Sequence, residues 1–316
     1  MHLVRATAVA LFAVVACDAC EGTDGLAGGV APERVDAGSR RDAGDADAPA
    51  GDVDGGPKPN LSRCDPLEPF GPPELQTDLE PTAYTVRAAV VSPDELEIHY
   101  LRYTPNDSNW ELRRATRPSR DARWEPAVTV PGIPAVAGMS MSAGGLKIHY
   151  WTADSNFVAS RKSVDDTFAD PKTFWLEKKP QLFVVAADDA AYFAELVVFG
   201  TTTERIIRRA PMNPNATGLL TPVEVPKIHA KGALDSQPVL NADETALYFS
   251  SNREGGKGLS DIWVARRGTK LDAFGPPVHV PELSTETVDA VSWVSNDDCE
   301  ILVERASHIY RAKRPL

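Results

Sequence analysis

The sequence predicts an all-β domain, a five-bladed β-propeller whose last blade is completed by an N-terminal strand. Three observations predict it. A pattern of strands recurs along residues 62–316, its copies are about 50 residues apart, and a short motif near the start of the domain repeats one near its end. Four strands in about 50 residues are typical of one propeller blade.

The clearest copy of the repeat spans residues 236–267. It contains an apolar strand, a polar turn at Asn241–Glu244, a second apolar strand, a glycine-rich loop and a third strand. The three strands carry the β-branched and aromatic residues that suit a sheet. A fourth strand is expected after Phe274-Gly-Pro276, because a proline is tolerated on an outer edge strand, where its missing N–H costs least.

The turn between the first and second strands marks each copy of the repeat. Successive turns are 50, 44, 55 and 54 residues apart. Aspartate is a good turn former, so the acids in these turns are expected to shape the chain and not to bind ligands. The residues taken as equivalent are Asp94, Gly144, Asp188, Asp243 and Asp297.

The two ends of the domain predict how the ring closes. The last copy stops after its third strand, at Leu316, whereas Pro69–Leu75 precedes the first copy and closely resembles Ala273–His279. We therefore expect the N-terminal strand to be the fourth strand of blade 5. This pairing hides an open sheet edge and sets the number of blades at five.

Residues 1–16 have the features of an export signal. Arg5 precedes an apolar run, Ala6–Ala16, that is too short to span a bilayer. The run ends Val14-Val-Ala-Cys17, which resembles the bacterial lipoprotein signal. The resemblance implies that the signal is cut before Cys17 and that its thiol carries a diacylglycerol anchor. The alternative is an ordinary secretory signal, and Asp18 after the cysteine does not decide between inner and outer membrane.

Residues 17–61 are expected to form a disordered tether. Between Asp18 and Asn60 there are ten acidic and four basic residues, so half of the net charge of −12 lies here. The segment is rich in Ala, Gly, Asp and Pro and has too few large apolar side chains to offset the entropy of ordering. Asp52-Val-Asp54-Gly lacks the other ligands of a calcium loop, so no metal site is expected.

Export implies an oxidising compartment, in which cysteines pair. Cys299 begins the second strand of blade 5, and Cys64 lies just before the strand that is expected to complete that blade. Second and fourth strands of an antiparallel sheet run the same way, so both thiols lie at the same end. We predict a Cys64–Cys299 disulfide, and we expect Cys20, in the tether, to be free or to pair with another molecule.

The repeat in blade 4 resembles the TolB-type, or WD40-like, propeller repeats. The run Pro238-x-x-x-x-Asp-x-x-x-Leu-Tyr-Phe-Ser-Ser-x-Arg253, followed by Asp261-Ile-Trp263, carries the resemblance. It implies a periplasmic or surface propeller that binds a protein or serves as a scaffold. The family has no catalytic motif to transfer to this chain.

Five-bladed propellers also include glycoside hydrolases, which need two or three carboxylates around the central channel. The expected innermost strands contain no Asp or Glu, so the chain is expected not to be an enzyme and to need no cofactor. These strands are Ala88–Val91, Met139–Met141, Leu182–Val185, Pro238–Leu240 and Val291–Trp293.

Two acids are nevertheless expected near the channel. Asp235 and Asp289 are 54 residues apart and directly precede the innermost strands of blades 4 and 5. They are candidates for binding a cation or a basic peptide end at the channel mouth; the alternative is that they are solvated or cap a turn. His99 and His149 occupy equivalent strand positions, which indicates packing between blades and not metal binding.

These features together predict a bacterial cell-envelope lipoprotein whose propeller binds an unidentified envelope protein or glycan. The acidic composition disfavours nucleic acid, contact with the membrane is expected through the lipid anchor only, and the chain is expected to be a monomer. The alternative is a carbohydrate-active enzyme, a glycoside hydrolase on a five-bladed propeller.

The lipid anchor can be tested directly. Metabolic labelling with a fatty-acid probe is expected to mark the wild-type protein and to leave Cys17→Ser unmarked, since the thiol is the acceptor of the lipid. Equal labelling of both proteins would contradict the lipoprotein signal.

Overall fold

The computed structural model describes residues 63–316 except 105–108, 134–135, 137, 143, 153–154, 175–180, 187–189 and 213–218. The expected signal peptide, the tether, Cys17 and Cys20 lie outside the described residues, as does the turn residue Asp188. In the part that is described, no helix has the length and apolarity needed to cross a membrane.

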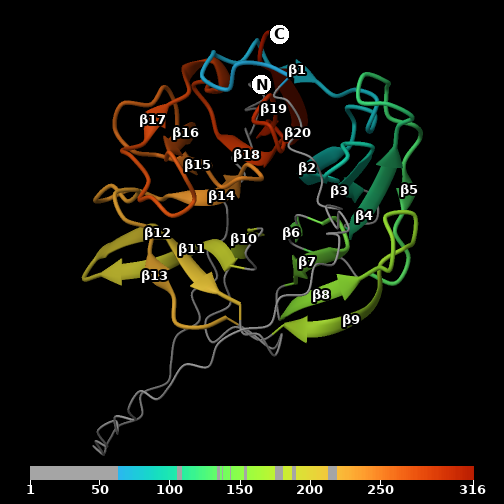
Figure 1. Cartoon of the computed structure of the whole chain (residues 1–316), viewed down its shortest axis with the longest axis horizontal. Coiled ribbons are helices and arrows are strands. Elements are labelled where there is room, and N and C mark those ends of the chain that lie inside the picture. Colours follow the sequence, from blue (N-terminus) through green and yellow to red (C-terminus); the bar gives the residue numbers. More distant parts are fainter. Residues whose placement is uncertain are drawn as a thin grey trace, which may run out of the picture. The chain divides into compact units, whose positions relative to one another are not determined.

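Five four-stranded antiparallel sheets make up this part of the chain (Figure 1). The innermost strands are β2 (Thr85–Val91), β6 (Gly138–Met141), β10 (Gln181–Val185), β14 (Ser236–Leu240) and β18 (Asp289–Val294). The second strands are β3 (Glu97–Thr104), β7 (Lys147–Trp151), β11 (Ala190–Phe199), β15 (Ala246–Ser251) and β19 (Glu300–Arg305). The third strands are β4 (Asn109–Thr116), β8 (Asn156–Ser160), β12 (Thr202–Pro211), β16 (Asp261–Arg266) and β20 (His308–Lys313). The outermost strands are β5 (Val128–Thr129), β9 (Ala169–Phe174), β13 (Val223–Glu224), β17 (Val278–His279) and β1 (Glu74–Leu75).

The sheets are the blades of a five-bladed β-propeller, as the repeat predicts. Each innermost strand contacts the innermost strand of the next blade, from β2 through β6, β10, β14 and β18, and β18 contacts β2 again. Apolar clusters fill the spaces between blades, and a single short 3-10 helix, Pro281–Leu283, is the one helical element of the described residues.

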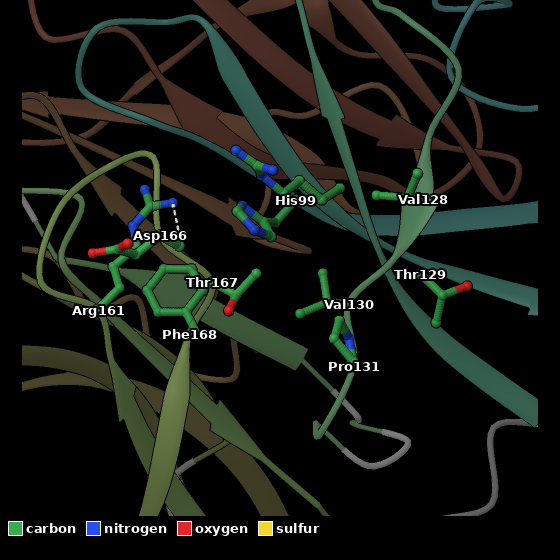
Figure 2. A pocket seen from close by; sticks show the side chains of 10 residues that line it. His99, Val128, Thr129, Val130, Pro131, Arg161, Asp166, Thr167 and Phe168 are labelled. Carbon is green, nitrogen blue, oxygen red and sulfur yellow. Dashed lines mark hydrogen bonds between the residues drawn. The ribbon is translucent and has the colours of Figure 1, made fainter.

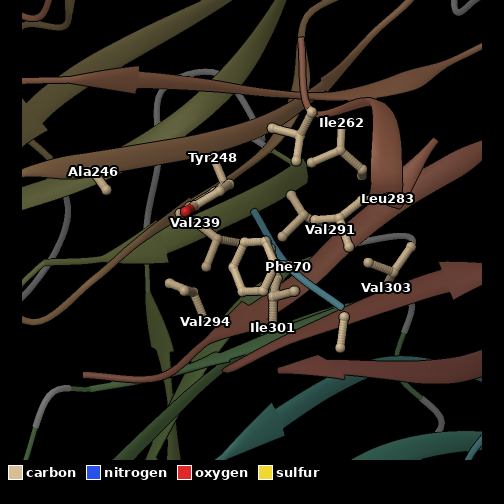
Figure 3. Packing of buried hydrophobic residues seen from close by; sticks show 12 residues of the cluster. Phe70, Val239, Ala246, Tyr248, Ile262, Leu283, Val291, Val294, Ile301 and Val303 are labelled. Atoms are coloured by element: carbon tan, nitrogen blue, oxygen red, sulfur yellow. The ribbon is translucent and has the colours of Figure 1, made fainter. Parts of the chain in front are cut away.

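The ring is closed by the N-terminal strand, which confirms the prediction. β1 pairs with β20, with Glu74 opposite Arg311, and Gly71 N–H donates to the carbonyl of Lys313 at 2.7 Å. Phe70 is 4% exposed. Figure 3 shows its ring among Val239, Val294 and Ile301, in the cluster between blades 4 and 5.

One arginine contact is repeated in four blades. An arginine directly after the third strand donates its Nε–H to the carbonyl of a residue in the first turn, and its guanidinium lies over the aromatic ring that precedes the fourth strand. The turn residues have positive φ angles, between 59° and 69°. The arginine, turn residue and ring are Arg117, Glu95 and Trp124; Arg161, Gly145 and Phe168; Arg267, Glu244 and Phe274; and Arg314, Asp298 and Phe70.

We call this contact the arginine clamp. Its Nε–O distances are 2.6–2.8 Å, and its guanidinium carbons lie 3.7–4.5 Å from the ring centroids. In blade 3 the residue after β12 is Met212, so that blade has no arginine at this position. The clamp formed by Arg314 and Phe70 joins the two ends of the domain.

The predicted Cys64–Cys299 disulfide is present, with its Cα atoms 5.7 Å apart. Beside it, Arg63 forms ion pairs with Asp297 at 2.8 Å and with Glu95 at 2.8 Å. These contacts tie the start of the domain to blade 5 and to the first turn of blade 1.

His99 and His149 lie inside the propeller, 1% and 2% exposed. Burial lowers the pKa of His99 to about 3 and that of His149 to about 4. Both imidazoles are therefore neutral at ordinary pH, and His99 packs edge-on against Phe168 of the next blade, with ring centroids 5.5 Å apart.

Removal of the disulfide is expected to destabilise the propeller. The cysteines are 235 residues apart, and in the chain-entropy model a cross-link closing so long a loop contributes about 5 kcal/mol. The double variant Cys64→Ser/Cys299→Ser should therefore unfold at a clearly lower urea concentration than the oxidised wild type. Cys20→Ser, which removes a thiol of the tether, is the matched control, and equal midpoints for all three proteins would contradict a stabilising cross-link.

Candidate functional site

Asp235 and Asp289 occupy equivalent places, but the structure buries both. Asp235 directly precedes β14 and Asp289 begins β18, so the innermost strand of blade 5 does carry an acid, contrary to the sequence analysis. Each residue is 0% exposed. Their carboxylates lie beneath the surface of the propeller and not in an open channel mouth.

Each of these carboxylates is held by an arginine. Asp235 pairs with Arg253 at 2.6 Å, and Asp289 pairs with Arg305 at 2.5 Å. The hydroxyl of Ser251 also donates to Asp235, and Thr285 donates to Asp289 through its N–H and its hydroxyl. These contacts hold loops at the start of the innermost strands, and a ligand-binding role for the two acids stays an untested prediction.

A histidine extends this network between blades 3 and 4. The ring nitrogens of His229 lie 2.7 Å from Glu204 and 3.2 Å from Asp235. The pKa of Glu204 is lowered by hydrogen bonds from the N–H of Gly232 and from His229. This network could not be identified from the sequence, because Glu204 and His229 lie in different parts of blade 3 and carry no local motif.

A third acid, Glu304, lies on the second strand of blade 5 and takes part in no ion pair among the described residues. Its Oε2 accepts the N–H of Ala88, on β2 of blade 1, at 3.0 Å. Burial raises the pKa of Glu304, against smaller lowering effects of this hydrogen bond and of the charge of Arg87. A carboxyl group in this state retains its proton to higher pH than an ordinary glutamate does.

Glu304 replaces a neutral residue of the other blades. Strand register places it opposite the start of the innermost strand, where the other blades have Leu101, Trp151, Ala194 and Ser250. In blade 4 the hydroxyl of Ser250 accepts the N–H of Val291, on the innermost strand of blade 5, at 3.2 Å. This contact corresponds to that between Glu304 and the N–H of Ala88, with a neutral hydroxyl in place of the carboxyl group. The turns taken as equivalent in the sequence would have aligned Glu304 with Glu195 of blade 3, so the repeat alone carried no signal for this residue, and only the strand register shows that its position is otherwise neutral.

Arg87 precedes Ala88, the residue that Glu304 contacts, and two aromatic rings lie beside Arg87 on blade 1. The guanidinium carbon of Arg87 is 3.7 Å from the ring centroid of Trp110, whose ring is 5.2 Å from that of Tyr103. All three side chains are partly exposed. Burial lowers the pKa of Arg87, and the charge of Glu304 partly opposes this effect.

We refer to Glu304, Arg87, Trp110 and Tyr103 as the seam site. Glu304 meets the Arg87–Ala88 segment where blades 5 and 1 join, and Arg87 connects it to the two rings of blade 1, of which Trp110 packs toward blade 2. The site combines a carboxyl group that favours its protonated form, a guanidinium and a partly exposed aromatic surface. A carboxyl group with a raised pKa can donate a proton in catalysis. Aromatic rings with a few polar groups around them are typical of small-molecule sites.

A small pocket between blades 1 and 2 is a weaker candidate. It has a volume of about 50 Å³, far below the roughly 300–1,000 Å³ of most ligand sites. Figure 2 shows the rings of His99 and Phe168 on one side of it and Val130 and Pro131 on the other. Arg161, which also lines it, is held by Glu97 at 2.8 Å, so the pocket has the features of a packing gap.

Among the described residues, no group of three or more His, Cys, Asp or Glu is placed to hold a metal ion. No protein-family model matches the sequence. A search of curated proteins also gave no match.

Solved structures with a similar fold are carbohydrate-active proteins in several cases. One described as a glycoside hydrolase has a TM-score of 0.50 and 11% sequence identity, over 79% of this chain and 92% of that chain. A mannose phosphorylase from Leishmania mexicana has a TM-score of 0.47 and 9% identity, over 78% and 89% of the two chains. A GH43_12 protein from a capybara gut metagenome has a TM-score of 0.45 and 11% identity, over 77% and 53%. At these identities the similarity establishes the propeller fold alone, and it does not single out the TolB or WD40 class.

The first of these structures corrects the functional prediction. The chain was expected to be a binding module or scaffold and not an enzyme, whereas the similar fold belongs to a glycoside hydrolase and favours the alternative. That expectation had considered carboxylates on the innermost strands only. Glu304 reaches the start of β2 from the second strand of the neighbouring blade.

The pKa of Glu304 has a measurable effect on stability. A group whose pKa is raised in the folded state stabilises the fold below its unfolded-state pKa, and this contribution is lost as pH rises through the folded-state pKa. Glu304→Gln keeps an oxygen for the N–H of Ala88 and cannot ionise. The stability of the variant relative to the wild type is therefore expected to increase as the pH rises above about 4.3, the ordinary pKa of glutamate, as measured by urea unfolding at several pH values. A difference that does not change with pH would contradict the raised pKa.

Proposed function

We propose that this protein is a carbohydrate-active enzyme of the glycoside hydrolase type, with Glu304 as its general acid. The observation that carries the proposal is the state of Glu304. Its carboxyl group is partly buried, is held by a backbone N–H and has a raised pKa without any ion pair among the described residues. A general acid needs this combination, because it must keep its proton until the leaving group takes it.

The other residues of the seam site have roles in binding a sugar. The exposed parts of Trp110 and Tyr103, beside the ring face that Arg87 covers, offer apolar surface against which a sugar can lie. The N–H of Ala88 fixes the Oε2 atom of Glu304, so that Oε1 is the oxygen that donates the proton to a glycosidic oxygen. Departure of the leaving group then generates the oxocarbenium-like state that water attacks, with a second carboxyl group as base or nucleophile.

Asp235 and Asp289 are not assigned to that second role. Their carboxylates are fully buried and paired with arginines, which favours a structural role. The fold supports the proposal independently, since a glycoside hydrolase has a similar one.

The location of the protein is also a proposal. The Val14–Cys17 ending of the export signal supports a lipid-anchored protein of the bacterial cell envelope, with residues 17–61 as a tether between membrane and propeller. An envelope or environmental glycan would then be the partner. The likeness of Pro238–Arg253 to TolB-type repeats is retained as a proposal about the class of the repeat only.

Substitution of Glu304 tests the enzymatic proposal. A panel of oligosaccharides and nitrophenyl glycosides is assayed with the wild type and with Glu304→Gln. General acid catalysis contributes about 10²–10⁴-fold, so kcat on oligosaccharides should fall by that factor. Nitrophenol is a good leaving group that needs little protonation, so the loss on nitrophenyl glycosides should be much smaller.

Glu254→Gln, at an exposed position, is the matched control and should retain wild-type rates. Equal losses on both kinds of substrate would assign Glu304 a structural role. No turnover of any glycan by the wild type would contradict the proposal itself.

A further inference from the structure

Arg87 carries a charge that the described residues do not pair. It lies near the start of β2, is partly exposed, forms no ion pair with a described residue, and has a buried Nε without a hydrogen-bond partner. Arg102 and Arg113, on the next two strands of the same blade, both pair with Glu80. The free guanidinium is therefore particular to Arg87 and not a property of this part of the blade.

The charge balance of the seam site depends on Glu304. The carboxyl group of Glu304 acts electrostatically on Arg87, but the two side chains form no ion pair. When Glu304 is protonated, as a general acid must be, it has no charge to offset that of the guanidinium. A partly buried cation without a partner is costly, and an anion bound beside it removes this cost.

The position of the guanidinium suits an anionic ligand. Trp110 lies under it at 3.7 Å, which fixes where it lies. The N–H groups of a guanidinium lie in its own plane, and two of them match the two oxygens of a carboxylate or a phosphate. An anion bound there would lie beside the aromatic surface of Trp110 and Tyr103, where the proposed function places the sugar ring.

We infer that the ligand of the seam site is an acidic sugar, whose carboxylate or phosphate group pairs with Arg87 while its ring lies against Trp110. The inference rests on the proposed function, since it names the substrate class of the same site. It adds the requirement that the sugar carry a negative charge, which follows neither from the fold nor from the proposed role of Glu304.

The experiment compares sugars that differ in charge. Glucose, glucuronic acid and glucose 6-phosphate are titrated into full-length Glu304→Gln, which is expected to bind without turnover, and binding is followed by calorimetry and tryptophan fluorescence. Charge-assisted hydrogen bonds predict that one or both anionic sugars bind about tenfold or more tightly than glucose. The two anionic sugars distinguish a carboxylate site from a phosphate site.

Substitutions of Arg87 and of a control residue, Arg123, test whether Arg87 causes the preference for anionic sugars. Adding Arg87→Gln to Glu304→Gln should reduce the affinity for the anionic sugar to that for glucose in a protein that stays folded, because Arg87 forms no ion pair with a described residue and the substitution removes only its stacking on Trp110. Arg123→Gln, at an exposed position, is the control and should leave the preference unchanged. Equal affinities for all three sugars, a preference that survives Arg87→Gln, or equally tight binding of inorganic phosphate or acetate would overturn the inference.

The two proposals can fail separately. Turnover of neutral glycans that depends on Glu304, with no preference for acidic sugars, would support the proposed hydrolase and contradict the inference that its substrate is acidic. Arg87-dependent binding of acidic sugars without any turnover would support the inference about the ligand and contradict the hydrolase.

Discussion

The arginine clamp is the interaction on which the rest of the propeller depends. In four blades one guanidinium joins a turn, the end of the third strand and the ring before the fourth strand. A hydrogen bond to a charged group contributes about 1.5–3 kcal/mol, and stacking of a cation on a ring adds about 0.5–2 kcal/mol. The outermost strands of blades 1, 4 and 5 are only two residues long, so the ring and its clamp, more than the strand, hold the outer edge of these blades.

The ring is closed by the same arginine clamp that occurs within blades 1, 2 and 4. Arg314, three residues from the C-terminus, clamps Phe70 from the N-terminal side of the domain, and the Cys64–Cys299 disulfide fixes the same blade covalently. This closure positions the seam site, because Glu304 belongs to blade 5 and Arg87 to blade 1. The carboxyl group reaches the N–H of Ala88 only when the two blades are side by side, so the chemistry proposed here requires a closed ring.

Much of the fold could be predicted because it repeats. Turn spacing predicted five blades, the resemblance of Pro69–Leu75 to Ala273–His279 predicted closure, and shared strand direction predicted the disulfide. The site could not be predicted in the same way, because function lies where the repeat is broken. Glu304 stands where the other blades have neutral residues, and Arg87 forms no ion pair among the residues that the structure describes; neither feature forms a motif. The buried state of Asp235 and Asp289 was also missed, because it depends on the paths of loops and on two arginines: Arg253, in the loop after β15, and Arg305, at the end of β19.

The central claim is that the seam site holds a carboxyl group with a raised pKa beside a guanidinium that forms no ion pair with a described residue. An NMR titration of the Glu304 carboxyl carbon, in the wild type and in Arg87→Gln, measures it most directly. The account predicts a pKa above the ordinary value of about 4.3 in the wild type and a still higher pKa in the variant, because the charge of Arg87 lowers the pKa of Glu304. An ordinary or lowered pKa in the wild type, or no change on removal of Arg87, would contradict the account.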